Sequence, residues 1–146
     1  MTPILEILPA GSWTSDPADQ VTLDYDGRHR RRIVMIGATG MEYMLDLPGA
    51  THLRDGDGLK LADGRVVRMI ARPEPLHEVR AASPEALIRL AWHIGNRHLA
   101  AAVTAEAILI RRDHVIAHML EHLGAEVREV EAPFDPEGGA YDGHAH

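Results

Sequence analysis

Hydrophobic and polar positions alternate along the first half of the chain in short runs. Val21, Leu23 and Tyr25 alternate with polar residues, and the same period of two recurs further along. The later runs hold Val34 and Ile36, residues 43–47, Leu59 and Leu61, and Val67 and Met69. Asp-Gly pairs separate several of the runs, and this dipeptide suits turns that need a positive φ. The pattern predicts a small antiparallel β barrel or sandwich over residues 1–73.

The period changes to that of a helix in the second half. The segment Arg72-Pro73-Glu74-Pro75 marks the boundary, because each proline biases the residue before it toward extended backbone. Ser83 is a good N-cap residue, and Pro84 suits the first helical position. Apolar residues recur at i, i+3, i+4 and i+7 over 87–94, and Gly95 is placed to end this helix.

The segments that follow predict the order βαββαβ, which is the ferredoxin-like arrangement. Asp113 is a good N-cap for a second helix, and Gly124 is placed to end that helix. Strands are expected at 76–80, 99–103, 107–110 and 127–130. The chain is therefore predicted to be an α+β protein with three parts. These are a small antiparallel β domain (1–73), a ferredoxin-like domain (74–134) and a flexible histidine-containing tail (135–146).

Composition limits the kinds of partner. Of the 146 residues, 45% are hydrophobic but only 4% are aromatic, which favours two small aliphatic cores. The net charge of −7 argues against nucleic acid, because phosphate binding needs a basic surface. No apolar run approaches the roughly 20 residues of a membrane span. The N-terminus lacks a signal-peptide pattern, so we expect no membrane partner and a cytoplasmic location.

The histidines are the candidate metal ligands. The chain has ten histidines and no cysteine, so a transition metal here would have nitrogen and oxygen ligands. His98 follows the end of the first helix and is expected at a loop edge. His144 and His146 lie two positions apart in the tail. Residue type and spacing alone leave two hypotheses open for these three: a metal site, or surface histidines without a role.

Three further histidines form one stripe on the second helix. His114, His118 and His122 are spaced i, i+4 and i+8, opposite the apolar residues of that helix. Residues 118–122 match the H-x-x-E-H pattern of a zinc peptidase, with Glu121 as the general base. A short helix in so small a unit leaves no room for a substrate cleft. A solvated polar face is therefore favoured for His118 and His122, and a zinc hydrolase is disfavoured.

A basic run, Arg28-His29-Arg30-Arg31-Arg32, stands out in this acidic chain. On a strand, alternate members of the run would share one face. A solvated hairpin is the favoured interpretation. The alternative is a docking patch for an acidic protein partner.

Several motifs together resemble one known family. They are His93-Ile94-Gly95-Asn96-Arg97-His98, then Asp113-His114-Val115, then the segment from Pro133 to Tyr141, and in the first half Leu53-Arg54-Asp55-Gly56-Asp57. In this order and spacing they resemble the UreE family of urease accessory proteins, which are nickel metallochaperones. The resemblance covers nearly the whole chain.

The resemblance implies a fold, a site and partners. It implies an N-terminal β domain that engages proteins, and a ferredoxin-like domain that binds metal and forms a homodimer. His98 matches a ligand that pairs across the dimer axis, tail histidines such as His144 and His146 complete the coordination, and His114 matches a further ligand. Many members have a long histidine-rich tail, whereas the tail of this chain has two histidines, so high-capacity nickel storage is not expected. Arg112 stands where some members have a second histidine beside the match to His114.

The resemblance also implies a function. The protein would not be an enzyme but a chaperone that delivers Ni²⁺ for assembly of the urease active site. Its partners would be the urease accessory GTPase and the urease apoprotein complex. Zn²⁺ or Cu²⁺ could replace Ni²⁺ in vitro, since imidazole accepts all three. The alternative is a protein–protein adaptor in a metalloenzyme maturation complex, with incidental metal binding.

Overall fold

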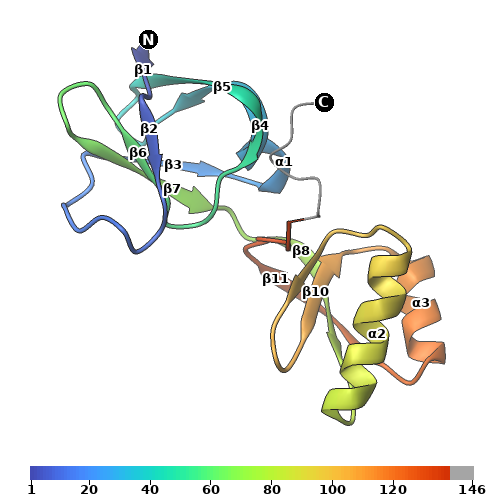
Figure 1. Cartoon of the computed structure of the whole chain (residues 1–146). Coiled ribbons are helices and arrows are strands. Elements are labelled where there is room, and N and C mark those ends of the chain that lie inside the picture. The colour runs from blue at the N-terminus through green and yellow to red at the C-terminus, as the bar shows by residue number, and fades with distance from the viewer. Residues whose placement is uncertain (139–146) are drawn as a thin grey trace. The chain divides into compact units, whose positions relative to one another are not determined.

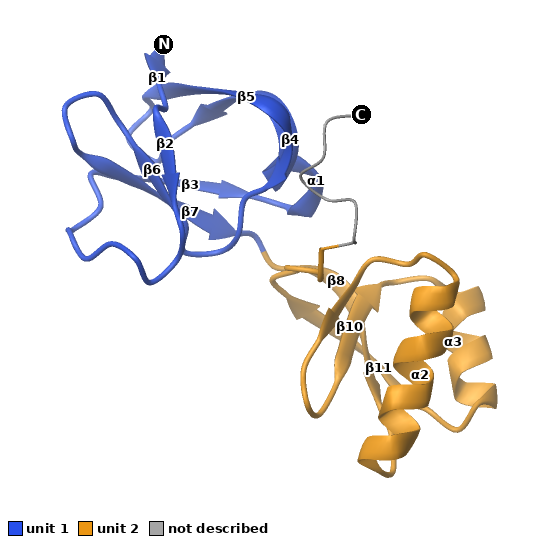
Figure 2. Cartoon of the chain, in the orientation of Figure 1, with its two compact units in different colours: residues 1–72, 139–146 blue, residues 73–138 orange. Residues whose placement is uncertain are grey.

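The structure, a computed structural model, describes residues 1–138. These residues form two compact units, Met1–Arg72 and Pro73–Gly138, and each has its own hydrophobic core. Figure 2 shows the two units in different colours. The tail residues 139–146, which include the candidate ligands His144 and His146, lie outside the described residues.

The first unit is built from two small sheets (Figure 1). One sheet has the order β1-β5-β4 and the other has the order β2-β6-β7-β3. The strands are β1 (Thr2–Pro3), β2 (Glu6–Leu8), β3 (Asp19–Leu23), β4 (His29–Ile36), β5 (Glu42–His52), β6 (Gly58–Lys60) and β7 (Val66–Ala71). The core lies between the sheets and contains Val21, Met35, Tyr43, Leu45, Leu53, Leu59, Leu61, Val67 and Met69.

Most of the alternation expected in this unit is present, but two pairings differ from an antiparallel domain. The pairs β1/β5 and β3/β7 are parallel. Parallel neighbours need a long connection, and the chain between β3 and β7 supplies one because it includes β4, β5 and β6.

Two local details of the first unit also differ from the alternation. In β4 the buried residue is Met35, whereas Val34 and Ile36 are exposed. Tyr25 does not continue β3 but opens the short helix α1 (Tyr25–Arg28). The cause is Asp24, whose side chain accepts a hydrogen bond from Gly27 N at 2.8 Å and caps the helix.

The second unit confirms the predicted βαββαβ order, and with it the α+β class. Its elements are β8 (Glu74–Arg80), α2 (Pro84–Asn96), β9 (Ala101–Val103), β10 (Ile108–Arg111), α3 (His114–His122) and β11 (Glu126–Ala132). The strands form one sheet of order β11-β8-β10-β9, in which neighbours are antiparallel. Figure 1 shows α2 and α3 on one face of this sheet.

The helices begin where the capping residues predict. The Ser83 side chain accepts from Ala86 N at 3.1 Å, and Asp113 accepts from Val115 N and Ile116 N at 2.9 and 3.1 Å. Each cap satisfies N–H groups that have no partner within the helix. The apolar stripes pack on the sheet, with Leu87, Leu90 and Ile94 of α2 and Leu120 of α3 buried beside Val79, Ile108 and Ile110.

The two helices run in opposite directions. α2 connects β8 to β9, and α3 connects β10 to β11. Both β10 and β11 are antiparallel to β8, and β9 is antiparallel to β10, so the two crossovers run in opposite senses. The C-terminal end of α2 and the N-terminal end of α3 therefore lie at the same end of the helix layer.

The segment after β11 packs against the second unit. Phe134 and Pro136 are buried, and Glu137 N donates to Ala101 O at 2.8 Å. Residues 135–138, which the sequence analysis assigned to the tail, are therefore held at the start of β9. Among residues 1–138, no helix is both long and apolar enough to span a bilayer.

Candidate metal centre

His98 occupies an unusual backbone position at the end of α2. Its φ is +58°, and it is the one non-glycine residue with a positive φ among residues 1–138. His98 N donates to Gly95 O at 3.0 Å, and Leu99 N donates to Ile94 O at 3.3 Å. This pair of bonds is the Schellman motif, whose left-handed residue is usually glycine. Gly95 was expected to end the helix, but it lies within the last turn and His98 takes the left-handed position instead.

The neighbouring helix supplies an internal comparison. α3 ends in the same motif, with Gly124 N donating to Glu121 O and Ala125 N donating to Leu120 O, both at 3.0 Å. Here the left-handed residue is Gly124, with φ of +93°. A side chain with a Cβ in this conformation costs about 1–2 kcal/mol. The chain bears that strain at His98 and avoids it at the equivalent position of α3, which is typical of a functional residue.

The His98 imidazole has no companion ligands in its own described chain. The side chain is exposed, as are Asn96 and Arg97 beside it. Across residues 1–138, no group of three or more His, Asp or Glu side chains is close enough to hold a metal ion. One imidazole does not hold a metal ion in a protein, so a site at His98 needs donors from outside these residues.

His114 lies at the same end of the helix layer as His98. It is the first residue of α3, directly after the capping residue Asp113, and its side chain is exposed. The structure therefore places two of the predicted ligands at one end of the second unit. It does not bring them into one coordination group within a single chain.

The tail histidines start from a point near His98. Glu137 is bonded to Ala101, which is three residues after His98. His144 lies seven positions after Glu137, and an extended chain spans at most about 24 Å over that length. The chain from Arg97 at the end of α2 to Ala101 spans at most about 14 Å, so a linker of the longer length is sufficient to reach the end of α2 within one copy.

The other histidines of the second unit lie apart from this end or have structural contacts. His118, Glu121 and His122 are exposed along α3, as expected for a solvated face. His93 contacts Trp92 edge to face, with ring centroids 5.1 Å apart. His77 is buried in β8, where its Nδ1 lies 3.5 Å from Asp113 N.

An exposed apolar face on α2 was missed by the sequence analysis. Ile88 and Trp92 are 69% and 63% exposed, although the core stripe of the same helix is buried. Ile88 also borders an apolar groove of about 200 Å³, lined by Pro84, Leu87, Ala91, Val103, Thr104, Ala105 and Ile108. The available signal was the i, i+4 spacing of Ile88 and Trp92 outside the core stripe. Large apolar side chains exposed together on a helix are typical of an interaction surface.

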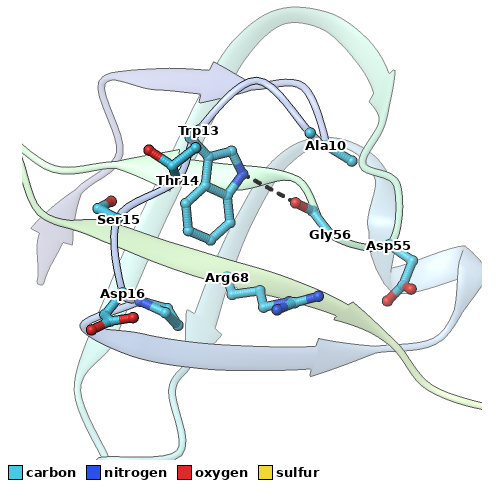
Figure 3. A pocket seen from close by; sticks show the side chains of 10 residues that line it. Ala10, Trp13, Thr14, Ser15, Asp16, Asp55, Gly56 and Arg68 are labelled. Atoms are coloured by element: carbon cyan, nitrogen blue, oxygen red, sulfur yellow. Dashed lines mark hydrogen bonds between the residues drawn. The ribbon is translucent and has the colours of Figure 1, made fainter.

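A second hollow lies in the first unit and differs in chemistry (Figure 3). It has a volume of about 460 Å³, and its polar lining includes Asp16, Asp55 and Arg68. Trp13 Nε1 donates to Gly56 O at 3.1 Å and fixes the indole at its wall. No histidine lines this hollow, so it is not part of the candidate metal centre.

Fold and site define a class of protein. It is a two-unit α+β protein whose ferredoxin-like unit presents exposed imidazoles and an exposed apolar helix face. Two family models match the chain: the N-terminal domain of the UreE urease accessory protein over residues 4–72, and its C-terminal domain over residues 74–146. The chain belongs to the UreE urease accessory protein family.

Curated relatives agree with this assignment. The urease accessory protein UreE of Bradyrhizobium sp. (strain ORS 278) is 55% identical over 142 residues, covering 96% of this chain and 68% of the relative. The protein of the same name from Bradyrhizobium sp. (strain BTAi1) is 55% identical over 140 residues, with the same coverage. That of Rhodopseudomonas palustris (strain HaA2) is 55% identical over 138 residues, covering 92% of this chain and 64% of the relative. The chain thus spans about two thirds of the length of these relatives.

Proposed function

We propose that this protein is a nickel metallochaperone that carries Ni²⁺ for assembly of the urease active site. In this proposal the ion is cargo, held between two copies of the chain by a pair of His98 imidazoles and by tail imidazoles from His144 or His146. His114 is an additional ligand near the surface. The relatives named above are urease accessory proteins, which supports a role in urease maturation.

The observation that carries the proposal is the conformation of His98. The chain tolerates a strained backbone at a residue whose side chain is exposed and has no hydrogen bond to another side chain among residues 1–138. A left-handed backbone at a residue with an exposed, chemically active side chain is typical of a functional position. An imidazole at the end of a rigid helix is well placed to meet a symmetry mate.

The apolar face of α2 supports a homodimer. Trp92 lies in α2, six residues before His98, and it is mostly exposed. A two-fold axis near the C-terminal end of α2 would cover Trp92 of both copies and place both His98 side chains beside the axis. The interface and the metal pair would then form together.

Such a site suits an ion that must be released. Two imidazoles from rigid elements hold the ion weakly, and tail imidazoles raise the coordination number toward the geometries that nickel accepts. Each tail ligand can detach by itself, so the ion can pass to a recipient by stepwise exchange. Ordering of the tail costs conformational entropy and limits the affinity. The recipients in this proposal are the urease accessory GTPase and the urease apoprotein complex, in the cytoplasm.

Calorimetry with Ni²⁺ on the full-length protein tests the site. The variant His98→Gly keeps the left-handed backbone and removes only the imidazole, so its effect on affinity is not a folding effect. We expect about one ion per dimer for the natural chain and an affinity at least tenfold lower for His98→Gly. The matched control is His118→Gln, which removes an exposed imidazole from α3 and should leave the affinity within twofold. An unchanged affinity in His98→Gly would contradict the assignment.

Acidification gives an independent check on the same protein. Imidazole must be neutral to bind a metal, so nickel should be released as the pH falls, with uptake of protons. Zn²⁺ should compete, and Cu²⁺ should bind more tightly, as expected for nitrogen ligands.

An experiment in cells distinguishes the adaptor hypothesis from the chaperone hypothesis. A host that lacks its own copy of this gene would express the natural chain or a variant with His98→Gly and residues 143–146 deleted. At limiting nickel, a chaperone predicts that urease activity falls severalfold in the variant and recovers with added nickel. An adaptor predicts full activity in both.

A further inference from the structure

Strand β4 lies at the edge of its sheet. In the order β1-β5-β4 it pairs with β5 on one side, and no other described strand pairs with its outer side (Figure 1). An edge strand presents main-chain N–H and C=O groups that can pair with another extended segment. The regular part runs from Arg32 to Ile36, after an irregularity in the register between Arg30 and Arg32.

The solvent-exposed face of β4 is apolar at its C-terminal end. Val34 and Ile36 are 49% and 68% exposed, whereas Met35 between them is buried in the core. Val34 pairs with Met44 of β5, and Ile36 pairs with Glu42. Two exposed branched residues on the same face of an edge strand lose water contact if another strand is added there.

The other end of β4 is strongly basic. Arg30, Arg31 and Arg32 are consecutive and exposed. Arg30 Nε donates to Asp26 O at 3.3 Å, and Arg31 Nη1 donates to Leu47 O at 3.5 Å. None of the three guanidinium groups forms an ion pair with a carboxylate in the part of the chain that the structure describes.

That arrangement is unusual in a chain with a net charge of −7. Elsewhere in the chain, Arg65 lies 2.7 Å from Asp63, and Arg80 and Arg128 each lie 2.9 Å from Glu78. Asp46 lies opposite Arg32 in the register with β5, yet no ion pair joins any of the three arginines of β4 to a carboxylate among residues 1–138.

Charge selects among the possible occupants of this edge. A second copy of β4, paired antiparallel about a two-fold axis, would place a second run of three arginines on the same short edge and supply no carboxylate to neutralise either run. A nucleic acid would meet a protein that is acidic as a whole, which opposes binding. An acidic extended segment would neutralise the arginines and gain the main-chain hydrogen bonds of strand addition.

We propose that β4 is a docking edge that accepts an acidic, extended segment of a partner protein as an additional strand. The segment carries carboxylates at alternate positions beside Arg30 and Arg32, and apolar side chains at alternate positions beside Val34 and Ile36. This surface belongs to the first unit and does not depend on the metal centre.

Synthetic peptides added to the full-length protein test the proposal. The probe is a nine-residue peptide with Glu at two alternate positions followed by Val at two alternate positions, made in both directions. Binding is measured by fluorescence anisotropy, and the site is mapped by NMR amide shifts. We expect one direction to bind, with the shifts centred on β4, and we expect the affinity to fall as salt rises.

Two changes to the peptide separate strand addition from simple charge attraction. N-methylation of alternate amides removes main-chain donors and should abolish binding if a strand is added. A poly-glutamate peptide of the same length has the charge without the apolar positions, and it should bind at least tenfold more weakly.

Matched charge variants of the protein test the surface. The triple variant Arg30→Ser, Arg31→Ser, Arg32→Ser should lose at least tenfold in affinity for the peptide. The control triple variant Arg65→Ser, Arg68→Ser, Arg89→Ser has the same net charge and should stay within twofold of the natural chain. Trp13 fluorescence and urea unfolding of the first unit should be unchanged in the first triple variant, which confirms its fold. Its nickel affinity should also be unchanged, which separates this proposal from the metal site.

The results that overturn the proposal are equally definite. They are the absence of binding by either peptide direction at millimolar concentration, equal binding by poly-glutamate, shifts centred away from β4, or equal losses in both triple variants. Tighter binding of a single-stranded oligonucleotide than of the peptide, lost in the first triple variant, would assign the arginines to a nucleic acid instead.

Discussion

His98 adopts the left-handed backbone conformation that Gly124 adopts at the matching position after α3. The position of His98 was predictable, since the sequence places it after the end of the first helix, and its side chain is exposed as expected. The left-handed backbone was not, because Gly95 offered a more obvious place for the helix to end. Only the hydrogen bonds at the end of α2 decide which residue takes the positive φ.

This comparison makes a stability prediction. His98→Gly should raise the free energy of unfolding of the metal-free protein by up to about 1 kcal/mol, because the strain is removed. Gly124→His should lower it by about 1–2 kcal/mol for the converse reason. Urea denaturation measures both changes. In the variant Trp13→Phe, fluorescence from Trp92 reports on the second unit alone. A loss of stability in His98→Gly would contradict the strain at this residue.

Asp19 is a buried carboxylate whose pKa lies well below its usual range. Burial raises its pKa, but hydrogen bonds from Thr39, from Tyr43 and from the main chain of Gln20 more than offset this and hold the pKa at about 2. Thr39 Oγ1 and Tyr43 Oη each donate to Oδ2 at 2.6 Å. Burial and the charge of Asp19 together raise the pKa of Tyr43.

The low pKa of Asp19 implies a pH dependence of stability. Because its pKa is lower in the folded chain than the usual 3.8, the carboxylate stabilises the first unit above about pH 4. That contribution, about 2 kcal/mol, is lost as the pH falls toward 2. We expect Asp19→Asn to be destabilised at pH 5 and to approach the natural chain near pH 2. Urea unfolding followed by Trp13 fluorescence in the Trp92→Phe background measures this. A constant difference between the two proteins across this range would contradict it.

At the scale of elements, capping residues and apolar spacing predicted both helices well. Ser83 and Asp113 cap α2 and α3, and the i, i+3, i+4 positions of each helix face the sheet. For the strands, the sequence was a poorer guide to which face is buried. Val34 and Ile36 were taken as a hydrophobic alternation, but Met35 is the residue that enters the core. Period two does not distinguish the two faces of an edge strand when both carry apolar residues.

The exposed face of α2 carries the prediction at this scale. Substituting Ile88→Glu and Trp92→Glu together should convert a homodimer into a monomer, since buried charges without partners oppose association. Sedimentation velocity measures the mass. Nickel affinity should fall in parallel, because the paired His98 site is lost. The control Val115→Glu changes an exposed apolar residue of α3 and should leave the dimer intact. A monomeric natural chain, or a dimer that survives the double substitution, would contradict the proposed interface.

At the scale of the whole molecule, the chain is two units with separate cores. The core of the first unit contains residues of strands β3, β4, β5, β6 and β7. The core of the second unit contains residues of β8, α2, β10 and α3. The division after Arg72 lies at the proline-rich segment that the sequence marks as a boundary. A unit with its own core can fold alone, although small units are only marginally stable.

We expect residues 73–146 to fold without the first unit. The isolated segment should show cooperative thermal unfolding by circular dichroism. In the proposed function it should also bind nickel with an affinity close to that of the full chain. Non-cooperative unfolding would show that the second unit depends on the first.

The sequence by itself determined the α+β class, the βαββαβ order, the helix starts and the identity of the candidate ligands. Those features follow from local chemistry, because capping, turn formation and apolar periodicity act between residues that are close along the chain. Tertiary structure alone decided that His98 is left-handed and that α2 keeps an exposed apolar face. It also decided that, among residues 1–138, β4 is an edge strand whose three arginines form no ion pair with a carboxylate. These three features depend on contacts between elements that are far apart in the sequence. The local pattern of residues does not specify which residues lie opposite one another in a sheet.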